Sequence, residues 1–340
     1  MTSAINADGG AARHSTRSHG AGSQVSAIIA AGLLLRVTIA TINAFDGPTM
    51  GAEYDAATFH EFAVDFAAGA VDEKACAVGW IYATILGYVY SLFGPSLLLG
   101  GLLSCGAWLL SAIILLRIAH TVGVEGWQLR LIAAIYAFLP PSLLFTSITI
   151  REPFQMLFVN GMALAGLRLF EARSLRSMLS FVFNAVAAST LHLALAATSA
   201  AAVVLIVLLR KFRGTSRRTL LLVPSLVLVS LAAVLQDEFG LDRLAKLLSE
   251  YRGNAIEGAR ANYPVTLSFD TGSELLIGIP VALFGYLFEP MPWRVLSILD
   301  GYVVVENVSR LLLLVSAIRY TWREGPGEPR RLLLLGTFLV

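Results

Sequence analysis

Long apolar runs separated by short clusters of charged residues follow one another along this chain. The first run, 25–43, is long enough to cross the roughly 30 Å of hydrocarbon in a bilayer, and no small-residue cleavage signal follows it. It therefore predicts an uncleaved membrane anchor. Residues 1–24 are rich in Ala, Gly, Ser and Thr and hold few bulky apolar side chains, so we expect a disordered tail there.

The later apolar runs predict an all-α, polytopic transmembrane domain over 25–340. The stretch 177–209 is too long for one helix, and we divide it near His192 into two short spans. The stretch 275–288 is short for a span and is interrupted by Gly and Pro, so we expect an interfacial or re-entrant segment. Further spans are expected at 97–117, 131–148, 153–170, 219–235 and 302–320.

The charges between the runs set the orientation. Arg13 and Arg17 precede the first run, and further basic residues gather in the predicted loops around 168–176 and 210–218. Loops rich in Lys and Arg stay in the cytoplasm, so the N-terminus is predicted to be cytoplasmic. The segments 44–96 and 236–301 are then external.

Composition agrees with a membrane protein and excludes one class of partner. Hydrophobic residues make up 56% of the chain and charged residues only 14%, which is more apolar surface than a water-soluble domain could bury. The net charge of +2 is too small to indicate a nucleic-acid partner.

The first external loop is rich in carboxylates. Between 44 and 77 seven acidic side chains stand against a single Lys74, which suits proton abstraction or cation binding. They are Asp46, Glu53, Asp55, Glu61, Asp65, Asp72 and Glu73.

Asp55 is the carboxylate with the most informative surroundings. It stands at the start of a predicted short amphipathic helix whose apolar face carries Phe59, Phe62 and Phe66. One interpretation of Asp55 is a helix cap that satisfies free backbone amides and the positive end of the helix dipole. Capping does not exclude catalysis, because one carboxylate oxygen remains available. The apolar, aromatic stretch 80–96 then predicts a second, juxtamembrane helix on the same face.

Arg151 and Glu152 interrupt apolar sequence at the outer end of two successive predicted spans. Charges at such a depth are costly and commonly line a functional cavity. The alternative is a turn, with Pro153 at a first helical position. Arg36, in the outer half of the first span, could meet a lipid phosphate or simply extend to the interface.

Taken in order, these features resemble the GT-C superfamily of membrane glycosyltransferases, in particular the bacterial relatives of protein O-mannosyltransferases and lipid A aminoarabinose transferases. The resemblance rests on AEYDAATFHEFA around Asp55, on GYVYSLFGPS, and on SITIREPF around Glu152, and it covers roughly 25–210. The chain departs from the family in having ACAVGW where a Pro-Pro element often stands. It also stops as an apolar run begins, so we expect further spans in an intact protein.

The resemblance implies transfer of a sugar, with inversion, from a polyprenyl-phosphate donor to a lipid, glycan or protein acceptor. The reaction would take place on the extracytoplasmic face of a bacterial inner membrane. It implies that Asp55 is the general base and that Glu152 orients a substrate or helps to hold a divalent cation; no other cofactor is implied, and the metal is unknown. The residues it assigns to substrate binding are Arg36, Arg151, His60 and Glu53.

Three other function classes remain open on the sequence. One is a structural membrane protein with no chemistry, in which the external carboxylates would be dispersed and solvated. A cell-surface polysaccharide polymerase or ligase would use external arginines, which 236–274 supplies in Arg243, Arg252 and Arg260. A non-enzymatic transporter or flippase would need polar residues near the bilayer midplane, and the charges gather at the outer face instead.

Overall fold

The computed structural model describes residues 9–47, 55–70, 80–172, 174–192, 290–295 and 297–324, together with isolated positions between 195 and 288. The described residues belong to two compact units: those up to Ile206 belong to unit 1, and those from Val207 onward belong to unit 2. No strand occurs in the residues so described, and the predicted all-helical class is confirmed.

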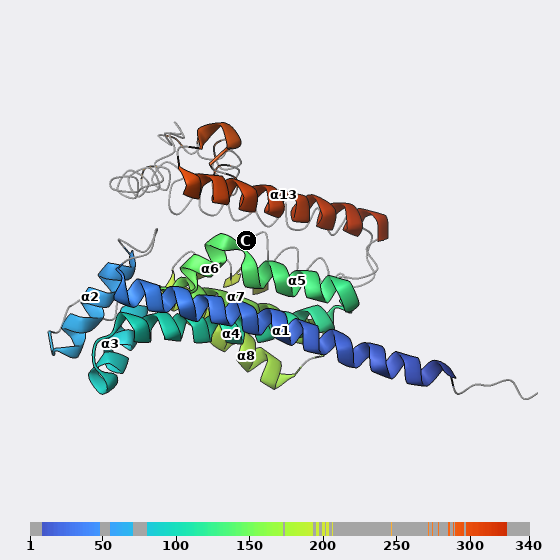
Figure 1. The fold of residues 1–340 in the computed structure, drawn as a ribbon, viewed down its shortest axis with the longest axis horizontal. Helices are drawn as coiled ribbons and strands as arrows, with labels where there is room; N and C mark the ends of the chain where they lie inside the picture. The colour runs from blue at the N-terminus through green and yellow to red at the C-terminus, as the bar shows by residue number, and fades with distance from the viewer. Residues whose placement is uncertain are drawn as a thin grey trace, which may run out of the picture. The chain divides into compact units, whose positions relative to one another are not determined.

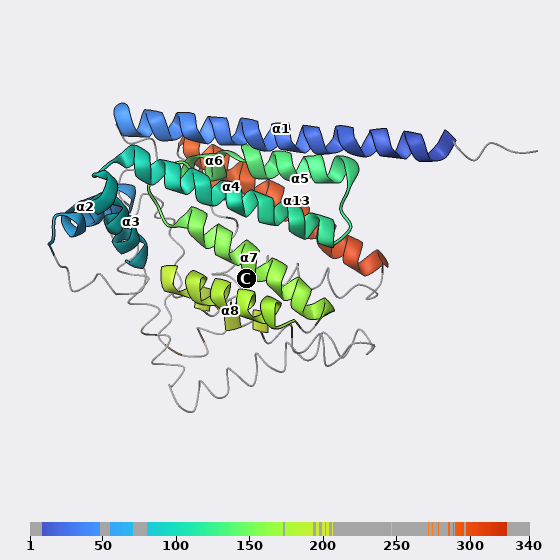
Figure 2. The ribbon, with the colours of Figure 1, turned by 90° about the horizontal axis from the view of Figure 1, so that it is seen from below.

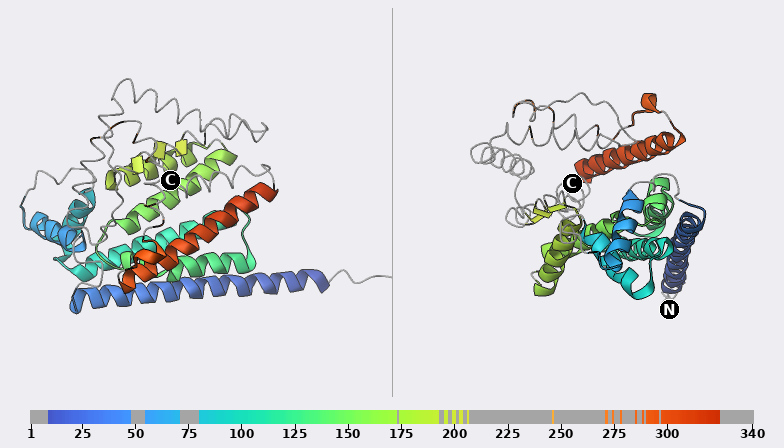
Figure 3. Two further views of the ribbon diagram at one scale, coloured as in Figure 1. Left: turned by 90° about the horizontal axis from the view of Figure 1, so that it is seen from above. Right: turned by 90° about the vertical axis from the view of Figure 1, so that its left-hand side faces the viewer.

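Unit 1 is a bundle of helices (Figure 1). Two further views show α1 lying against α4 and α5, with α7 beyond α4 and α8 beyond α7 (Figures 2 and 3). The short helices α2 and α3 pack on each other. The helices are α1 (Gly9–Phe45), α2 (Asp55–Ala67), α3 (Ile81–Phe93), α4 (Leu97–Thr121), α5 (Gly126–Phe138), α6 (Pro140–Phe145), α7 (Glu152–Glu171) and α8 (Leu175–Leu191).

The course of the chain gives unit 1 two distinct ends. At one end α1 stops and α2, α4 and α7 begin; we call this the carboxylate end, after Asp55 and Glu152. At the other end α4 and α7 stop and α8 begins; we call this the arginine end, after Arg117, Arg168 and Arg176.

Two helices among the described residues are long and apolar enough to cross a membrane: Gly22–Phe45 within α1, and α4. Both contain spans predicted from the sequence. The apolar helices α3 and α8 are shorter. The predicted end of a helix near His192 is confirmed, because His192 is the extended residue that follows α8.

The prediction of one span over 131–148 is wrong. The segment forms two helices, α5 and α6, separated by Leu139 in an extended conformation. Pro140 follows Leu139, and the ring of a proline disfavours helical backbone at the residue before it. The helix therefore ends at Phe138, and α6 begins at the proline itself.

The N-terminal tail also differs from the prediction. Residues 9–24, expected to be disordered, continue α1 as helix. Extending an existing helix costs far less than nucleating one, so the apolar part of α1 can carry this extension although it is rich in Gly and Ser. Residues 1–8 lie outside the described part.

The segment between α6 and α7 fits tightly against α4. Residues 146–150 are buried, and they approach α4 where it carries Gly100 and Gly101. A Cβ atom on Gly100 would lie 2.5 Å from Thr149 Oγ1, and one on Gly101 would lie 2.9 Å from the Ser147 carbonyl oxygen. Because Gly100 and Gly101 have no side chain, the segment 146–150 can pack closely on α4, and this contact positions the start of α7.

The α2–α3 pair is anchored to the same region by an apolar core. Phe59 of α2 packs edge-on against Tyr82 of α3, with ring centroids 5.3 Å apart. Ile148, Ile150 and Leu191 belong to the same cluster. The predicted amphipathic helix beginning at Asp55 is therefore confirmed, and it lies beside the start of α7.

In unit 2 the described elements are a short 3₁₀ helix, η2 (Pro292–Arg294), and α13 (Ile298–Glu324). A reciprocal pair of bonds caps α13: Ser297 N donates to Asp300 Oδ2 at 2.9 Å, and Asp300 N donates to Ser297 Oγ at 3.1 Å. Helix α13 contains the predicted 302–320. The predictions for 219–235, 236–274 and most of 275–288 fall outside the described residues.

Candidate functional site

Carboxylates from two distant parts of the chain meet at the carboxylate end of unit 1. Asp55 is the first residue of α2 and is exposed. Glu152 is the first residue of α7. The Asp55 carboxylate lies close enough to Glu152 to help raise the pKa of that carboxyl group.

The two oxygens of Glu152 have different surroundings. Oε1 lies 3.8 Å from Arg151 Nε. Oε2 is inaccessible to solvent and makes no hydrogen bond with any of the residues that the structure describes. Burial is the main cause that raises the pKa of Glu152, and Asp55 adds to it, while backbone amides and Arg151 act in the opposite direction. Glu152 therefore holds a proton to higher pH than an ordinary glutamate does.

Arg151 ties this site to the neighbouring helices. Its Nη1 donates to the Leu191 carbonyl oxygen at 3.3 Å, at the end of α8. Its guanidinium carbon lies 5.6 Å from the centroid of the Phe59 ring on α2. Arg151 is also the residue that precedes α7, with a proline in the first turn after it, so the turn interpretation is confirmed. The turn interpretation and the site interpretation are compatible, because the turn places Arg151 and Glu152 beside α2.

Among the residues that the structure describes, three other buried polar atoms close by make no hydrogen bond of ordinary geometry: Tyr82 Oη on α3, Ser104 Oγ on α4 and Gln155 Nε2 on α7. Tyr82 and Ser104 nevertheless lie close enough to interact with each other. Tyr82 interacts electrostatically with Glu152, which places its hydroxyl group near that carboxyl. Buried polar atoms are normally paired, so this group offers hydrogen-bonding capacity to a hydroxyl or a water. These three residues could not be singled out from the sequence, because single polar side chains in apolar helices are common.

His60, predicted as a substrate-binding residue, is held by a short chain of hydrogen bonds. Its Nδ1 lies 2.8 Å from Tyr90 Oη, and Tyr90 donates its only proton to the Ser96 carbonyl oxygen at 2.9 Å. Nδ1 must then carry the hydrogen of the ring, which leaves Nε2 as the nitrogen that can accept a proton. Burial lowers the pKa of His60, although Glu61 acts against it, so the ring is neutral at neutral pH.

Arg36 is fully buried, and its surroundings differ from the prediction of a phosphate contact. Its guanidinium group has five N–H donors, and five contacts inside unit 1 take them up. Its Cζ also lies 3.6 Å from the centroid of the Trp108 ring. The acceptors are Thr146 Oγ1 at 2.6 Å, the Gly32 oxygen at 3.0 Å, the Ala137 oxygen at 2.8 Å, the Tyr136 oxygen at 3.4 Å and Ser142 Oγ at 3.3 Å. In this structure Arg36 joins α1, α4, α5 and α6 and has no donor left for a ligand.

Two further expectations concern Glu53 and a metal ion. Glu53, which the resemblance assigns to substrate binding, lies outside the described residues. Within those residues no group of three or more His, Cys, Asp or Glu side chains is arranged to hold a metal ion. Asp55 and Glu152 would supply two carboxylates toward the divalent cation that the sequence analysis left open.

No family model matches the chain, and no curated protein or solved structure is detectably similar to it.

Replacing Glu152 with glutamine is predicted to stabilise unit 1 in a pH-dependent way. The native pKa of Glu152 is raised, so ionising this group as the pH rises costs stability, whereas the neutral amide bears no such cost. Glu152→Gln should exceed the wild type in thermal stability near pH 8, and the difference should vanish below the ordinary glutamate pKa of about 4.5. Thermal unfolding in detergent at a series of pH values measures this. A difference that is constant with pH would contradict the prediction, and Glu61→Gln, which alters an exposed side chain, is the matched control.

Proposed function

We propose that this chain is a polytopic membrane glycosyltransferase that uses a polyprenyl-phosphate-linked sugar, as the resemblance to the GT-C superfamily implies. The observation that supports it most is that Asp55, Arg151 and Glu152 meet at the carboxylate end of unit 1. This end combines an exposed carboxylate, a cationic side chain and a carboxyl group of raised pKa. A sugar transfer from a lipid phosphate needs a base, a group that offsets phosphate charge, and a hydrogen-bonding group.

The surface of α8 supports a membrane environment. Its exposed large apolar residues recur at helical spacing, so they form one stripe, and such a stripe calls for an apolar surrounding. They are Leu175, Met178, Leu179, Val182, Phe183 and Val186. Together with the two apolar helices long enough to cross a membrane, this stripe favours a lipid-embedded bundle.

The charges at the two ends support the proposed orientation. Arg117, Arg130, Arg168 and Arg176 are exposed or half-buried at the arginine end, where the positive-inside rule predicts the cytoplasm. Asp55 and Glu152 are then on the extracytoplasmic face, where polyprenyl-linked sugars and their acceptors would be used.

The proposed reaction is a single displacement. Asp55 takes the proton of an acceptor hydroxyl group, whose oxygen forms a bond to the anomeric carbon of the donor sugar. The bond from that carbon to the phosphate oxygen breaks, and the polyprenyl phosphate leaves with its electron pair. Arg151 offsets the charge of the leaving phosphate, and Glu152 orients a substrate hydroxyl group through a hydrogen bond. Arg36 is not assigned a role in this step, because its donors are already used.

Transfer of radiolabelled sugar in proteoliposomes tests the proposal. The full-length protein is supplied with a panel of polyprenyl-phosphate sugars, and we expect transfer from at least one donor, with inversion at the anomeric carbon. Nucleotide sugars serve as the control donors and should be inactive. Absence of transfer from every lipid-linked donor would contradict the proposal and favour a transporter, and retention of configuration would contradict the single displacement.

A further inference from the structure

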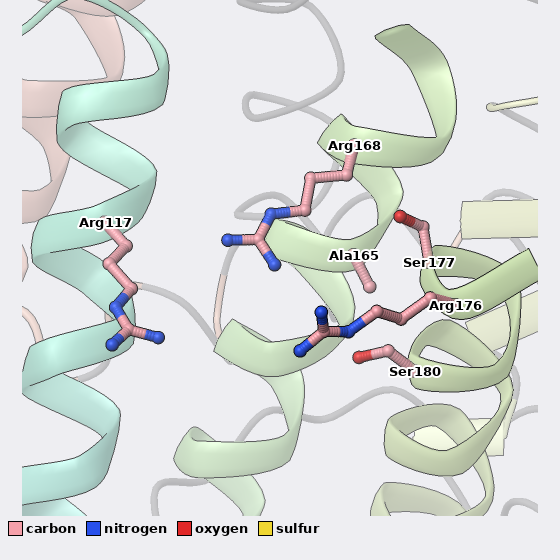
Figure 4. Close-up of a pocket in the computed structure, with 6 residues that line it drawn as sticks. All are labelled: Arg117, Ala165, Arg168, Arg176, Ser177 and Ser180. Atoms are coloured by element: carbon pink, nitrogen blue, oxygen red, sulfur yellow. The ribbon is translucent and has the colours of Figure 1, made fainter. Parts of the chain in front are cut away.

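A second cluster of charged side chains lies at the arginine end of unit 1, around a cavity of about 550 Å³. It is lined by Arg117 of α4, by Ala165 and Arg168 of α7, and by Arg176, Ser177 and Ser180 of α8. Figure 4 shows the side chains of Arg168 and Arg176 extending toward α4, which carries Arg117. We call it the arginine cavity.

The described lining of the arginine cavity carries positive charge alone. Three guanidinium groups contribute to it, and none of the described residues that line the cavity is Asp or Glu. Like charges brought together from three helices repel one another, and an anion placed between them replaces that repulsion with attraction. Keeping three such side chains around one space therefore favours an anionic occupant.

The donors of the arginine cavity suit a phosphate group. Guanidinium groups bind phosphate oxygens through pairs of parallel N–H bonds, and serine hydroxyl groups add single donors. Ser177 and Ser180 follow Arg176 on α8, so one turn of this helix presents a cation and two hydroxyl groups to the cavity.

The surface next to the arginine cavity is apolar. On α8, Leu175 and Leu179 are 66% and 59% exposed, and they stand directly beside Arg176 and Ser180 in the sequence. A polar cavity bordered by exposed leucines matches a molecule that has an anionic headgroup and acyl chains.

We propose that the arginine cavity binds a phosphate group, carried by an anionic phospholipid or free in solution. This site is separate from the proposed transfer site, since it lies at the opposite end of α7. A chain without transferase activity would bind the phosphate group equally well, so the two proposals fail independently.

Titration with phosphatidylglycerol tests the lipid source. The full-length protein in phosphatidylcholine nanodiscs receives increasing phosphatidylglycerol, and native mass spectrometry counts the bound molecules. We expect each substitution Arg117→Gln, Arg168→Gln or Arg176→Gln to weaken binding about fivefold, from roughly 1 kcal/mol per arginine near a membrane surface. The triple variant should lose binding by roughly a hundredfold.

The matched control is Arg130→Gln. Arg130 lies near the same end, on α5, where it donates to Gln24 Oε1, and it does not line the cavity. Its loss should leave phosphatidylglycerol binding unchanged. Thermal unfolding of each variant confirms that the bundle is intact, and the single substitutions serve if the triple variant does not fold.

Titration with inorganic phosphate in detergent, without lipid, tests the second source. If phosphate raises the thermal stability of the wild type but not of the triple variant, the site takes free phosphate. If the wild type binds phosphatidylglycerol but does not respond to phosphate, the site takes a lipid headgroup. The proposal is overturned if neither binds, or if Arg130→Gln weakens binding as much as the cavity variants do.

Discussion

Replacing Arg36 with methionine should destabilise unit 1 by about 1–3 kcal/mol, the usual cost of leaving a buried hydrogen-bonding group without its partner. A whole domain is commonly stable by only about 5–15 kcal/mol, so this loss endangers the fold. The side chain is fully buried between α1 and the α5–α6 break. Methionine has a similar length but no hydrogen-bond donor. Thr146 Oγ1 and the carbonyl oxygen of Ala137 would therefore lose the hydrogen bonds that Arg36 donates, in a buried place where water cannot replace them.

The measurement is thermal or denaturant unfolding of the full-length protein in detergent, followed by circular dichroism. Arg117→Met is the matched control, because Arg117 is an exposed arginine on α4 and should change stability little. Arg36→Lys should fall between the wild type and Arg36→Met. Lysine keeps the charge but offers fewer donors and no planar group to lie over Trp108. An Arg36→Met protein as stable as the wild type would show that this network does not hold the helices together.

The sequence predicted the structure best where a helix or turn depends only on residues that are close together in the chain. The phenylalanines at 59, 62 and 66 define one face of a helix, and α2 begins at Asp55 as that spacing predicts. The turn before α7 was also readable, since Arg-Glu-Pro fixes the backbone at the first helical positions.

The break between α5 and α6 shows how a hydrophobicity pattern can mislead. The apolar run at 131–148 is long enough to suggest one span, but Pro140 and Pro141 stand inside it. Backbone geometry at the residue before a proline outweighs the apolar character of its neighbours. The signal was present in the sequence, and giving more weight to the paired prolines would have placed the break.

The surroundings of Arg36 could not be predicted, because they depend on contacts between distant parts of the chain. The sequence shows an arginine in an apolar run, which is consistent with a lipid-facing, interfacial or buried side chain. Only packing reveals that Trp108, Tyr136 and Thr146 surround it. The meeting of Asp55 and Glu152 has the same origin: topology placed both on one side, and the tertiary fold brought them within electrostatic range.

Asp55→Asn should lower sugar transfer by roughly 10²–10⁴-fold, the usual contribution of a general base. Asparagine has nearly the same shape but cannot accept the proton of the acceptor hydroxyl group. Asp55 is exposed, so the substitution should leave the bundle intact. The pKa of Glu152 should fall at the same time, because the nearby negative charge that helps to raise it is gone.

Initial rates in proteoliposomes, measured beside thermal unfolding of the same preparations, separate loss of catalysis from loss of folding. Glu61→Gln is the control for removing an exposed acidic charge from α2 and should retain transfer. Activity retained in Asp55→Asn would contradict the assignment of the base. The neutral imidazole of His60 would then be the next candidate, since its Nε2 can accept a proton, and His60→Gln would decide between the two. A protein in which both Asp55→Asn and Glu152→Gln keep full activity would place the chemistry away from the carboxylate end altogether.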